Sequence, residues 1–160
     1  MSFKAATHRV IDAAAELGLE LSVQRFPEGT RTAQDAADAI GCGVAAIAKS
    51  IVVASDQGAV LVLTSGANLV DFPRVEAAAG VTGVRRASAE EARAATGYAI
   101  GGTAPFGLAT AMRILADRDL MLFDEVWVAA GTPDTVFPLE PRELITGAGA
   151  TVADVAQTAG

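Results

Sequence analysis

The sequence predicts an α+β fold: a mixed β-sheet, built largely from hairpins, with helices packed against it. Two segments carry this prediction. Residues 47–63 contain two apolar runs joined by Asp56-Gln57-Gly58, which is typical of a β-hairpin. Residues 125–139 repeat the arrangement, with a turn at 131–134. Helical segments lie between these strands without the strict strand–helix alternation of a Rossmann fold, so we expect a mixed sheet.

The helices are predicted from apolar residues at helical spacing and from capping residues at their ends. The first is expected to run from a Ser2 cap to Leu17, before Gly18. The best-defined start is residues 88–91, Ser-Ala-Glu-Glu, which has the spacing of a capping box, and Gly97 ends that helix. The other predicted helices are one capped by Thr32 that ends at Gly41, one capped by Asp71 that continues through 75–79, and a short one from Pro141 through Leu144.

The strands are predicted from short apolar runs bounded by turn residues. Residues 47–54 form the clearest strand, because two sets of side chains alternate along it. The other predicted strands are 21–26, 59–63, 125–130 and 135–139, and further apolar runs lie at 112–116 and 120–123.

Composition limits the functional classes. The 160 residues are expected to form one domain, residues 1–160. No window holds 18 consecutive apolar residues and the first residues lack a signal-peptide pattern, so no membrane association is predicted. The single cysteine, Cys42, excludes an internal disulfide and fits a reducing cytoplasm, which is the predicted location. The net charge of −7 excludes a general DNA or RNA coat and leaves only local contact with a nucleic acid.

Lys49 is the first candidate for a functional residue. It lies in the middle of an apolar strand, on the face made by Ile47, Ile51 and Val53, where a cation is costly unless it is paired or close to water. A lysine in such a place can supply a fixed positive charge to a carbonyl, a phosphate or a developing oxyanion. The alternative is a stem that extends along the sheet so that the ammonium reaches water at its edge.

A second candidate is the segment Gly101-Gly102-Thr103-Ala104-Pro105-Phe106-Gly107. Its glycines allow the backbone to approach a ligand closely, and its proline stiffens the loop. The alternative is a simple tight connection. The spacing matches neither the dinucleotide-binding nor the P-loop pattern, so neither of these ligands is predicted.

Other chemistries find little support. Cys42 lacks a neighbouring base in the sequence, because the only histidine is His8, on the first predicted helix with Asp12. Ser50 is a hydroxyl donor without a nucleophile-elbow motif. No ligand spacing for a metal is present, and no cofactor is predicted. The arginines could collect into a small basic surface, but solubility and ordinary surface pairing are the preferred interpretation; these residues are Arg25, Arg31, Arg74, Arg85 and Arg86.

Taken together, these segments resemble the YbaK and prolyl-tRNA-synthetase-associated family of aminoacyl-tRNA editing domains. The resemblance rests on their order and spacing over nearly the whole chain. The matching segments are Thr32-Ala33 to Ala37 before Gly41, Ile47-Ala48-Lys49-Ser50, Gly97-Tyr98 leading into 101–107, 126–131, and Leu144 followed by 147–155.

The resemblance implies a partly barrel-like mixed sheet surrounded by helices, and hydrolysis of the ester that joins a wrong amino acid to tRNA, often tRNA for proline. It makes Lys49 the catalytic residue, holding the terminal phosphate or the ester carbonyl. N–H groups near Gly101 and Gly102 would polarise that carbonyl, and the substrate's ribose hydroxyl would assist water. Implied substrate-binding residues are Ser50, Gly101, Gly102, Thr103 and Pro105. Many relatives carry serine where Ala104 stands, which leaves the amino-acid preference open.

The partners implied by the resemblance are the tRNA acceptor end and a prolyl-tRNA synthetase. The main alternative is a non-catalytic module that binds an amino acid or an aminoacyl end beside a synthetase. A third hypothesis is a hydrolase of small esters that does not need tRNA.

Overall fold

The computed structural model describes residues 2–27, 30 and 32–157. Helices and strands alternate irregularly along the chain. The α-helices are α1 (Ala5–Glu16), α2 (Ala33–Ile40), α3 (Phe72–Ala79), α4 (Ala89–Thr96) and α5 (Pro141–Ala148), with 3₁₀ turns η1 (Val44–Ala46) and η2 (Arg118–Leu122). The strands are β1 (Gln24–Arg25), β2 (Ile47–Ala54), β3 (Val60–Ser65), β4 (Arg85–Arg86), β5 (Arg113–Asp117), β6 (Val126–Ala129), β7 (Thr135–Leu139) and β8 (Thr151–Ala153).

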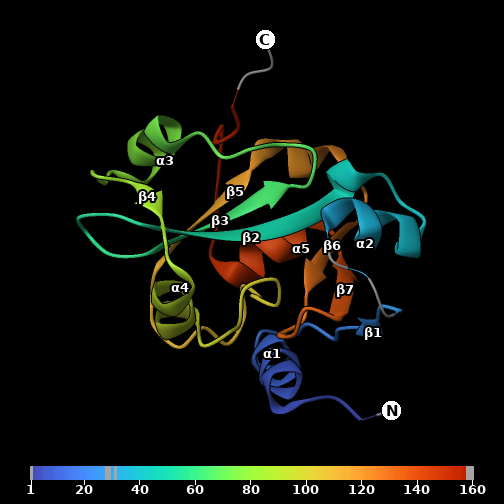
Figure 1. The fold of residues 1–160 in the computed structure, drawn as a ribbon. Helices are drawn as coiled ribbons and strands as arrows, with labels where there is room; N and C mark the ends of the chain where they lie inside the picture. The colour runs from blue at the N-terminus through green and yellow to red at the C-terminus, as the bar shows by residue number, and fades with distance from the viewer. Residues whose placement is uncertain (1, 28–29, 31, 158–160) are drawn as a thin grey trace.

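The strands form one mixed sheet in the order β1-β7-β6-β2-β3-β5-β8, and β4 pairs with the end of β2. Antiparallel hairpins join β2 to β3 and β6 to β7. Parallel pairings join β2 to β6, β3 to β5 and β5 to β8. Figure 1 shows β6 and β7 running steeply across the direction of β2 and β3, so the sheet is strongly curved. The mixed sheet with helices against it is confirmed.

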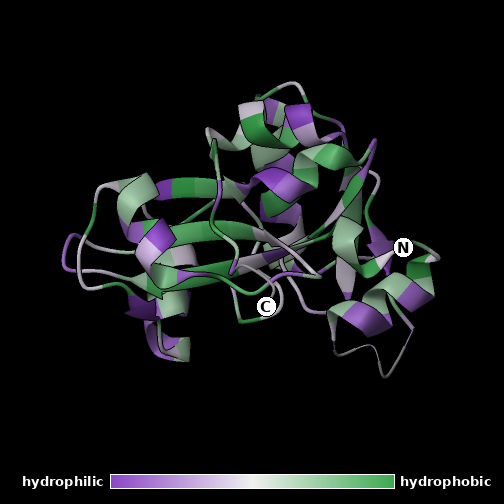
Figure 2. Cartoon of the chain, turned by 90° about the horizontal axis from the view of Figure 1, so that it is seen from above, coloured by the Kyte–Doolittle hydropathy of each residue, from purple (hydrophilic) through white to green (hydrophobic). Residues whose placement is uncertain are grey.

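Helices cover both faces of this sheet. The largest apolar cluster brings Val10 of α1, Ala92 of α4 and Leu144 of α5 against one face. On the other face, Val75 of α3 packs with Val53 and other strand residues, and α2 forms a separate small cluster around Ile47. Figure 2 shows that apolar residues dominate the strands, whereas the helices alternate polar and apolar stretches. None of the helices in the described part of the chain is long and apolar enough to cross a bilayer.

Several predicted boundaries are confirmed. The strands at 47–54 and 135–139 are found with the expected ends. The hydroxyls of Thr32 and Ser88 each accept a hydrogen bond from the third residue of their helix and complete capping boxes. Asp71 caps α3 by accepting from the Arg74 N–H.

Two predictions need correction, and one apolar run is now assigned. Helix α1 begins at Ala5 after Lys4, which makes no side-chain cap, whereas the carbonyl of Ser2 accepts a hydrogen bond from Arg25 at 2.8 Å. The strand predicted at 21–26 is reduced to Gln24–Arg25, because only these residues meet β7. The apolar run at 120–123 lies largely in the 3₁₀ turn η2, which begins where Asp117 accepts from the Asp119 N–H.

The two serines proposed as caps give a direct test of this assignment. Ser88→Ala should lower the free energy of unfolding by about 1 kcal/mol, because one N–H of α4 loses its acceptor. Ser2→Ala, at an exposed residue whose hydroxyl caps no helix, should change it by less than about 0.5 kcal/mol. Urea denaturation measures both variants, and equal losses would contradict the assignment.

Candidate functional site

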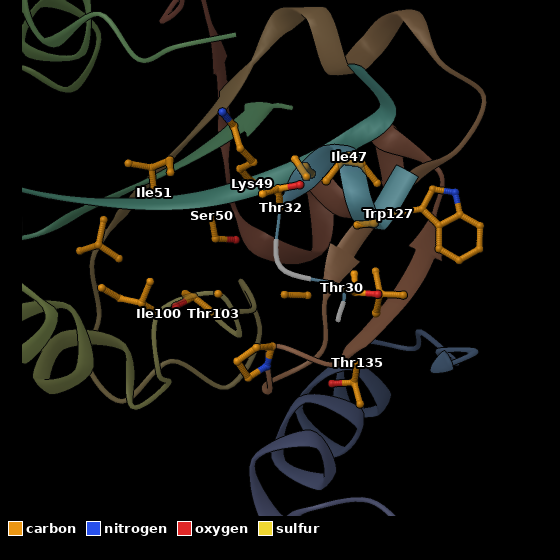
Figure 3. Close-up of a pocket in the computed structure, with 18 of the residues that line it drawn as sticks. Thr30, Thr32, Ile47, Lys49, Ser50, Ile51, Ile100, Thr103, Trp127 and Thr135 are labelled. Carbon is orange, nitrogen blue, oxygen red and sulfur yellow. The ribbon is translucent and has the colours of Figure 1, made fainter. Parts of the chain in front are cut away.

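A cavity of about 580 Å³ lies beside the middle of β2. Residues 47–52 of β2 line it, together with the start of α2, the beginning of the glycine loop, and residues of β4, β6 and β7 (Figure 3). Segments far apart in the sequence therefore meet at this strand.

The cavity exists because one edge of β2 is only partly covered. On that edge β2 pairs with β6 at Ile47 and Ala48, and with β4 at Val53 and Ala54. Between these two pairings, no strand among the described residues covers the edge. The gap exposes the section of β2 that contains Lys49 and Ser50.

The main chain of Ser50 faces this gap. In an antiparallel pair, successive residues direct their N–H and C=O groups to opposite edges of the strand. The Ile47 carbonyl accepts from the Gly66 N–H at 2.7 Å, on the β3 side. The Val52 carbonyl accepts from the Ala87 N–H at 3.3 Å, on the other side. Ser50 lies two residues before Val52, so its N–H and C=O groups also point away from β3, toward the cavity.

The side chains of β2 divide the cavity wall into two parts. Lys49 projects on one side of β2, whereas Ser50 projects on the opposite side, toward Thr103 (Figure 3). Arg86 lies on the Lys49 side, because its cross-strand partner Val53 has the same orientation as Lys49. All four polar residues line the cavity, with the cations on one side and the hydroxyls on the other.

Lys49 is half-buried and anchored. Its Nζ donates a hydrogen bond to the main-chain carbonyl of Asn68 at 2.8 Å. Burial lowers the pKa of the Lys49 ammonium, the neighbouring Arg86 charge lowers it further, and the Asp117 carboxylate acts in the opposite direction. Lys49 thus lines the cavity with its ammonium in a fixed position beside the Asn68 carbonyl, and the side chain does not extend freely into water.

Ser50 has an unsatisfied hydroxyl. Its Oγ is buried and has no hydrogen-bond partner in the part of the chain that the structure describes. A buried polar group without a partner costs about 1–3 kcal/mol. A polar ligand atom that reached this hydroxyl would recover that free energy, so Ser50 is suited to ligand contact.

The glycine loop contributes only part of its length to the wall. Gly101, which has a φ of +87°, and Thr103 line the cavity, whereas Gly102 and Pro105 are buried behind them. The Gly102 N–H donates to the Ala99 carbonyl at 3.0 Å. The expectation that the Gly102 N–H polarises a substrate carbonyl is therefore corrected, because this donor is occupied within the loop. Ala104 is fully buried in the core and does not line the cavity.

Tyr98, which the sequence analysis did not assign to the site, packs on the interior side of this loop. It is almost fully buried, and its hydroxyl donates to the Phe106 carbonyl at 2.5 Å. The Arg9 guanidinium lies 4.3 Å from the centre of its ring. One side chain thus ties together the two ends of the segment that carries Gly101 and Thr103.

A group of threonines supports the loop from the β6–β7 turn. Thr135, at the cavity wall, lies 2.7 Å from the Thr132 hydroxyl and 3.3 Å from the Thr7 hydroxyl of α1. The Thr132 hydroxyl donates to Asp134 at 2.6 Å, which lowers the pKa of that carboxyl. The Gly131 N–H donates to the Gly102 carbonyl at 2.9 Å, so the turn and the glycine loop are directly joined.

The residues considered for cysteine catalysis and metal binding do not form a site. Cys42 packs with the apolar cluster of α2, and burial raises the pKa of its thiol. His8 is exposed on the outer side of α1, where its ring meets Phe3. Within the described residues, no group of three or more histidine, cysteine or acidic side chains is arranged to hold a metal ion.

Two further residues matter at this site without having been predicted as site residues, Arg86, which lines the cavity, and Asn68, which contacts Lys49. Arg86 was expected to be an ordinary surface arginine, and Asn68 lies in a connection without a motif. A pair of adjacent arginines after a turn was the only available signal for Arg86. No local pattern indicates that the Asn68 carbonyl meets Lys49.

Comparison with known proteins gives consistent results. The family model described as an aminoacyl-tRNA editing domain matches residues 27–146. The chain is 31% identical to the uncharacterized protein YwhH of Bacillus subtilis, over 78% of this chain and 80% of YwhH. It is also 31% identical to a proline–tRNA ligase of Xanthomonas oryzae over 62% of this chain, but that match covers only 18% of the ligase.

The fold of this chain matches a solved structure over the full length of that structure. That structure is described as a candidate trans-editing enzyme for prolyl-tRNA synthetase, with a TM-score of 0.93 and 40% sequence identity. The match covers 98% of this chain and all of that structure.

The contact between Gly102 and the β6–β7 turn can be tested by adding one methyl group. A Cβ at Gly102 would lie 2.8 Å from Thr132 backbone atoms, so Gly102→Ala must displace the loop or the turn. We expect a loss of about 1–3 kcal/mol in the free energy of unfolding. Gly43→Ala, where a Cβ meets nothing within 4 Å, should change it by less than about 0.5 kcal/mol. Urea denaturation compares the two, and an unaffected Gly102→Ala would contradict the proposed close approach.

Proposed function

Because the chain belongs to the aminoacyl-tRNA editing domain family, we propose that it is a deacylase that hydrolyses the ester of a mischarged tRNA in trans. The proposed substrate is tRNA for proline that carries a small, wrong amino acid. One observation carries the proposal. A single cavity has two cations on one side of β2, while on the other side it has a chamber of hydroxyls and small apolar residues.

The cationic side suits the acceptor end of a tRNA. Lys49 and Arg86 lie close enough for the Arg86 charge to act on the Lys49 ammonium. Two like charges at one opening are costly unless an anion joins them, and a phosphate of the terminal nucleotides is such an anion. Contact limited to this end requires few phosphates, which fits a chain whose net charge is −7.

The opposite side suits a small aminoacyl group. Ala87 and Ala92 contribute short side chains there, and Ile100 lies at its edge. The hydroxyls of Ser50 and Thr103 are the polar groups on this side. A small chamber excludes a larger correct amino acid by steric clash, which complements a synthetase that gains only about 1–3 kcal/mol from one methylene group.

The proposed reaction is attack of water on the ester carbonyl carbon. The ribose oxygen leaves with a proton, and the products are the free amino acid and deacylated tRNA. None of the described residues that line the cavity is a histidine, aspartate or glutamate. The ribose hydroxyl next to the ester is therefore the proposed group that orients and activates the water. Lys49 holds the substrate by its terminal phosphate or its ester carbonyl, and Gly101 lies where the loop would meet the ester.

A prolyl-tRNA synthetase is the proposed partner, and the cytoplasm, where charged tRNA is used, is the proposed location. No cofactor enters the proposed reaction. The absence of an acid or base from the described cavity wall also favours a second candidate, a module that binds the aminoacyl end without hydrolysing it. Turnover distinguishes the two, because only an enzyme converts substrate in excess over protein.

Replacement of Lys49 tests the proposed catalytic role. Lys49→Ala should lower deacylation of mischarged tRNA for proline by about 10²–10³-fold, because the substrate loses one charge-stabilising contact. The measurement is release of radiolabelled alanine, serine, cysteine or threonine with protein at one hundredth of the tRNA concentration. Lys4→Ala, at the only other lysine, is the control and should retain activity. Full activity of Lys49→Ala would contradict the role, and binding without turnover by the wild type would favour the binding module.

Replacement of Arg86 tests the proposed phosphate contact. Arg86→Gln should raise KM for the tRNA about tenfold, because a charge-assisted contact to phosphate contributes about 1.5–3 kcal/mol. Its neighbour supplies a matched control, since Arg85 is held by Glu91 through hydrogen bonds of 2.8 and 2.7 Å. Steady-state kinetics should show an unchanged KM for Arg85→Gln. If both variants behave alike, Arg86 has no specific contact.

A further inference from the structure

The anchor of Lys49 is itself held in place. Asn68, whose carbonyl accepts from Lys49, lies in the connection after β3 rather than in a helix or strand. A carbonyl in a loop has no regular ladder to fix its direction. Its position depends on what holds the rest of the residue.

Two carboxylates hold the Asn68 side chain. Its Nδ2 donates to Asp117 and to Asp119, with both distances at 2.8 Å. An amide nitrogen has two hydrogens, so both of them are engaged. Asn68 is thus clamped through its side chain while its main-chain carbonyl faces the Lys49 ammonium.

Asp117 connects this clamp to the sheet. It is 1% exposed at the end of β5, and it accepts from the Ser65 N–H at 3.1 Å and from the Asp119 N–H at 3.0 Å. Ser65 ends β3, the strand next to β2. The carboxylate is therefore fixed by the rigid ends of two strands and does not depend on solvent.

The charges that face Lys49 come from three elements. Arg86 of β4 opposes the positive charge, and Asp117 at the end of β5 favours it. Asp119 of η2 reaches the lysine only through Asn68. Burial of Lys49 disfavours its charged form, and the buried Asp117 carboxylate acts against this effect.

We propose that Asn68 and Asp117 are positioning residues that hold the Lys49 ammonium at the cavity and keep it charged. The inference rests on the proposed function for its catalytic consequence, because a fixed cation is useful only if a substrate phosphate or ester carbonyl meets it. The arrangement of the anchor itself does not depend on that function. Neither residue touches the substrate.

The direct test is an NMR titration of the lysines. With Lys4 and Lys49 as the only two, ¹³C labelling at lysine Cε gives two side-chain signals, and Lys4 serves as an internal reference. An ammonium loses its charge as the pH rises through its pKa. Asp117→Asn removes the favourable charge, so the Lys49 midpoint should fall while the Lys4 midpoint stays constant. An unchanged Lys49 midpoint in a folded variant overturns the proposal.

Two further variants serve as a charge control and as an alternative test. Asp124→Asn removes a negative charge at an exposed residue and should leave the Lys49 midpoint unchanged. Asn68→Ala removes the clamp but leaves the Asp117 hydrogen bonds to the main chain, so it decides the matter if Asp117→Asn does not fold. The Lys49 midpoint should fall in Asn68→Ala as well. A midpoint that remains at the wild-type value there also overturns the proposal.

Enzyme kinetics of Asn68→Ala distinguish a role in positioning Lys49 from a role in stabilising the fold alone. Asn68→Ala should lower deacylation by about 10²-fold at neutral pH, as expected for a misplaced group. After subtraction of spontaneous hydrolysis, the decline of activity at high pH should begin at a lower pH than in the wild type. A decline at the wild-type pH, with the same thermal stability, overturns the catalytic part. If the wild type itself releases no amino acid, the proposed function fails while the NMR result still decides the anchor.

Discussion

The candidate site depends on one constraint, the incomplete pairing of one edge of β2. Backbone N–H and C=O groups that lie in a protein interior require partners, so an uncovered strand edge is either solvated or used. Here β6 leaves the edge after Ala48 and β4 joins it only at Val53, so the intervening section opens onto a cavity. Both faces of the candidate site follow from it, because a strand with an open edge is accessible on both of its sides.

Part of the cavity wall, opposite β2, consists of irregular segments that polar contacts hold in place. The glycine loop is fixed by the Tyr98 hydroxyl at its back and by main-chain hydrogen bonds to the β6–β7 turn. Hydrogen bonds between threonine hydroxyls connect the β6–β7 turn to α1 and hold it in place. Such contacts specify one loop conformation where apolar packing alone would leave several. A loop whose shape is determined before ligand binding loses less conformational entropy when a ligand arrives.

The charge at the site is opposite in sign to the net charge of the chain. A net charge of −7 disfavours general association with nucleic acid, yet Lys49 and Arg86 place two positive charges beside one cavity. Repulsion elsewhere and attraction at the cavity would together restrict a polyanion to contact through one end. The buried carboxylate behind Lys49 compensates for the cost of holding that cation beside another.

The sequence by itself determined the local elements and the candidate lysine, whereas the tertiary structure decided what surrounds it. Caps such as Thr32 and Ser88, and the strand at 47–54, could be predicted because they depend on spacing within a few residues. Lys49 could be identified because a cation in an apolar strand is locally unusual. The start of α1 and the extent of β1 could not, since they depend on whether another segment pairs with them. The clamp of Asn68 by Asp117 joins residues 49 positions apart. The cluster of Arg86 with Lys49 and the gap beside Ser50, which the pairing of Ile47 with Trp127 bounds, are likewise formed by segments distant in the sequence. Their formation depends on long-range packing, which no local pattern specifies.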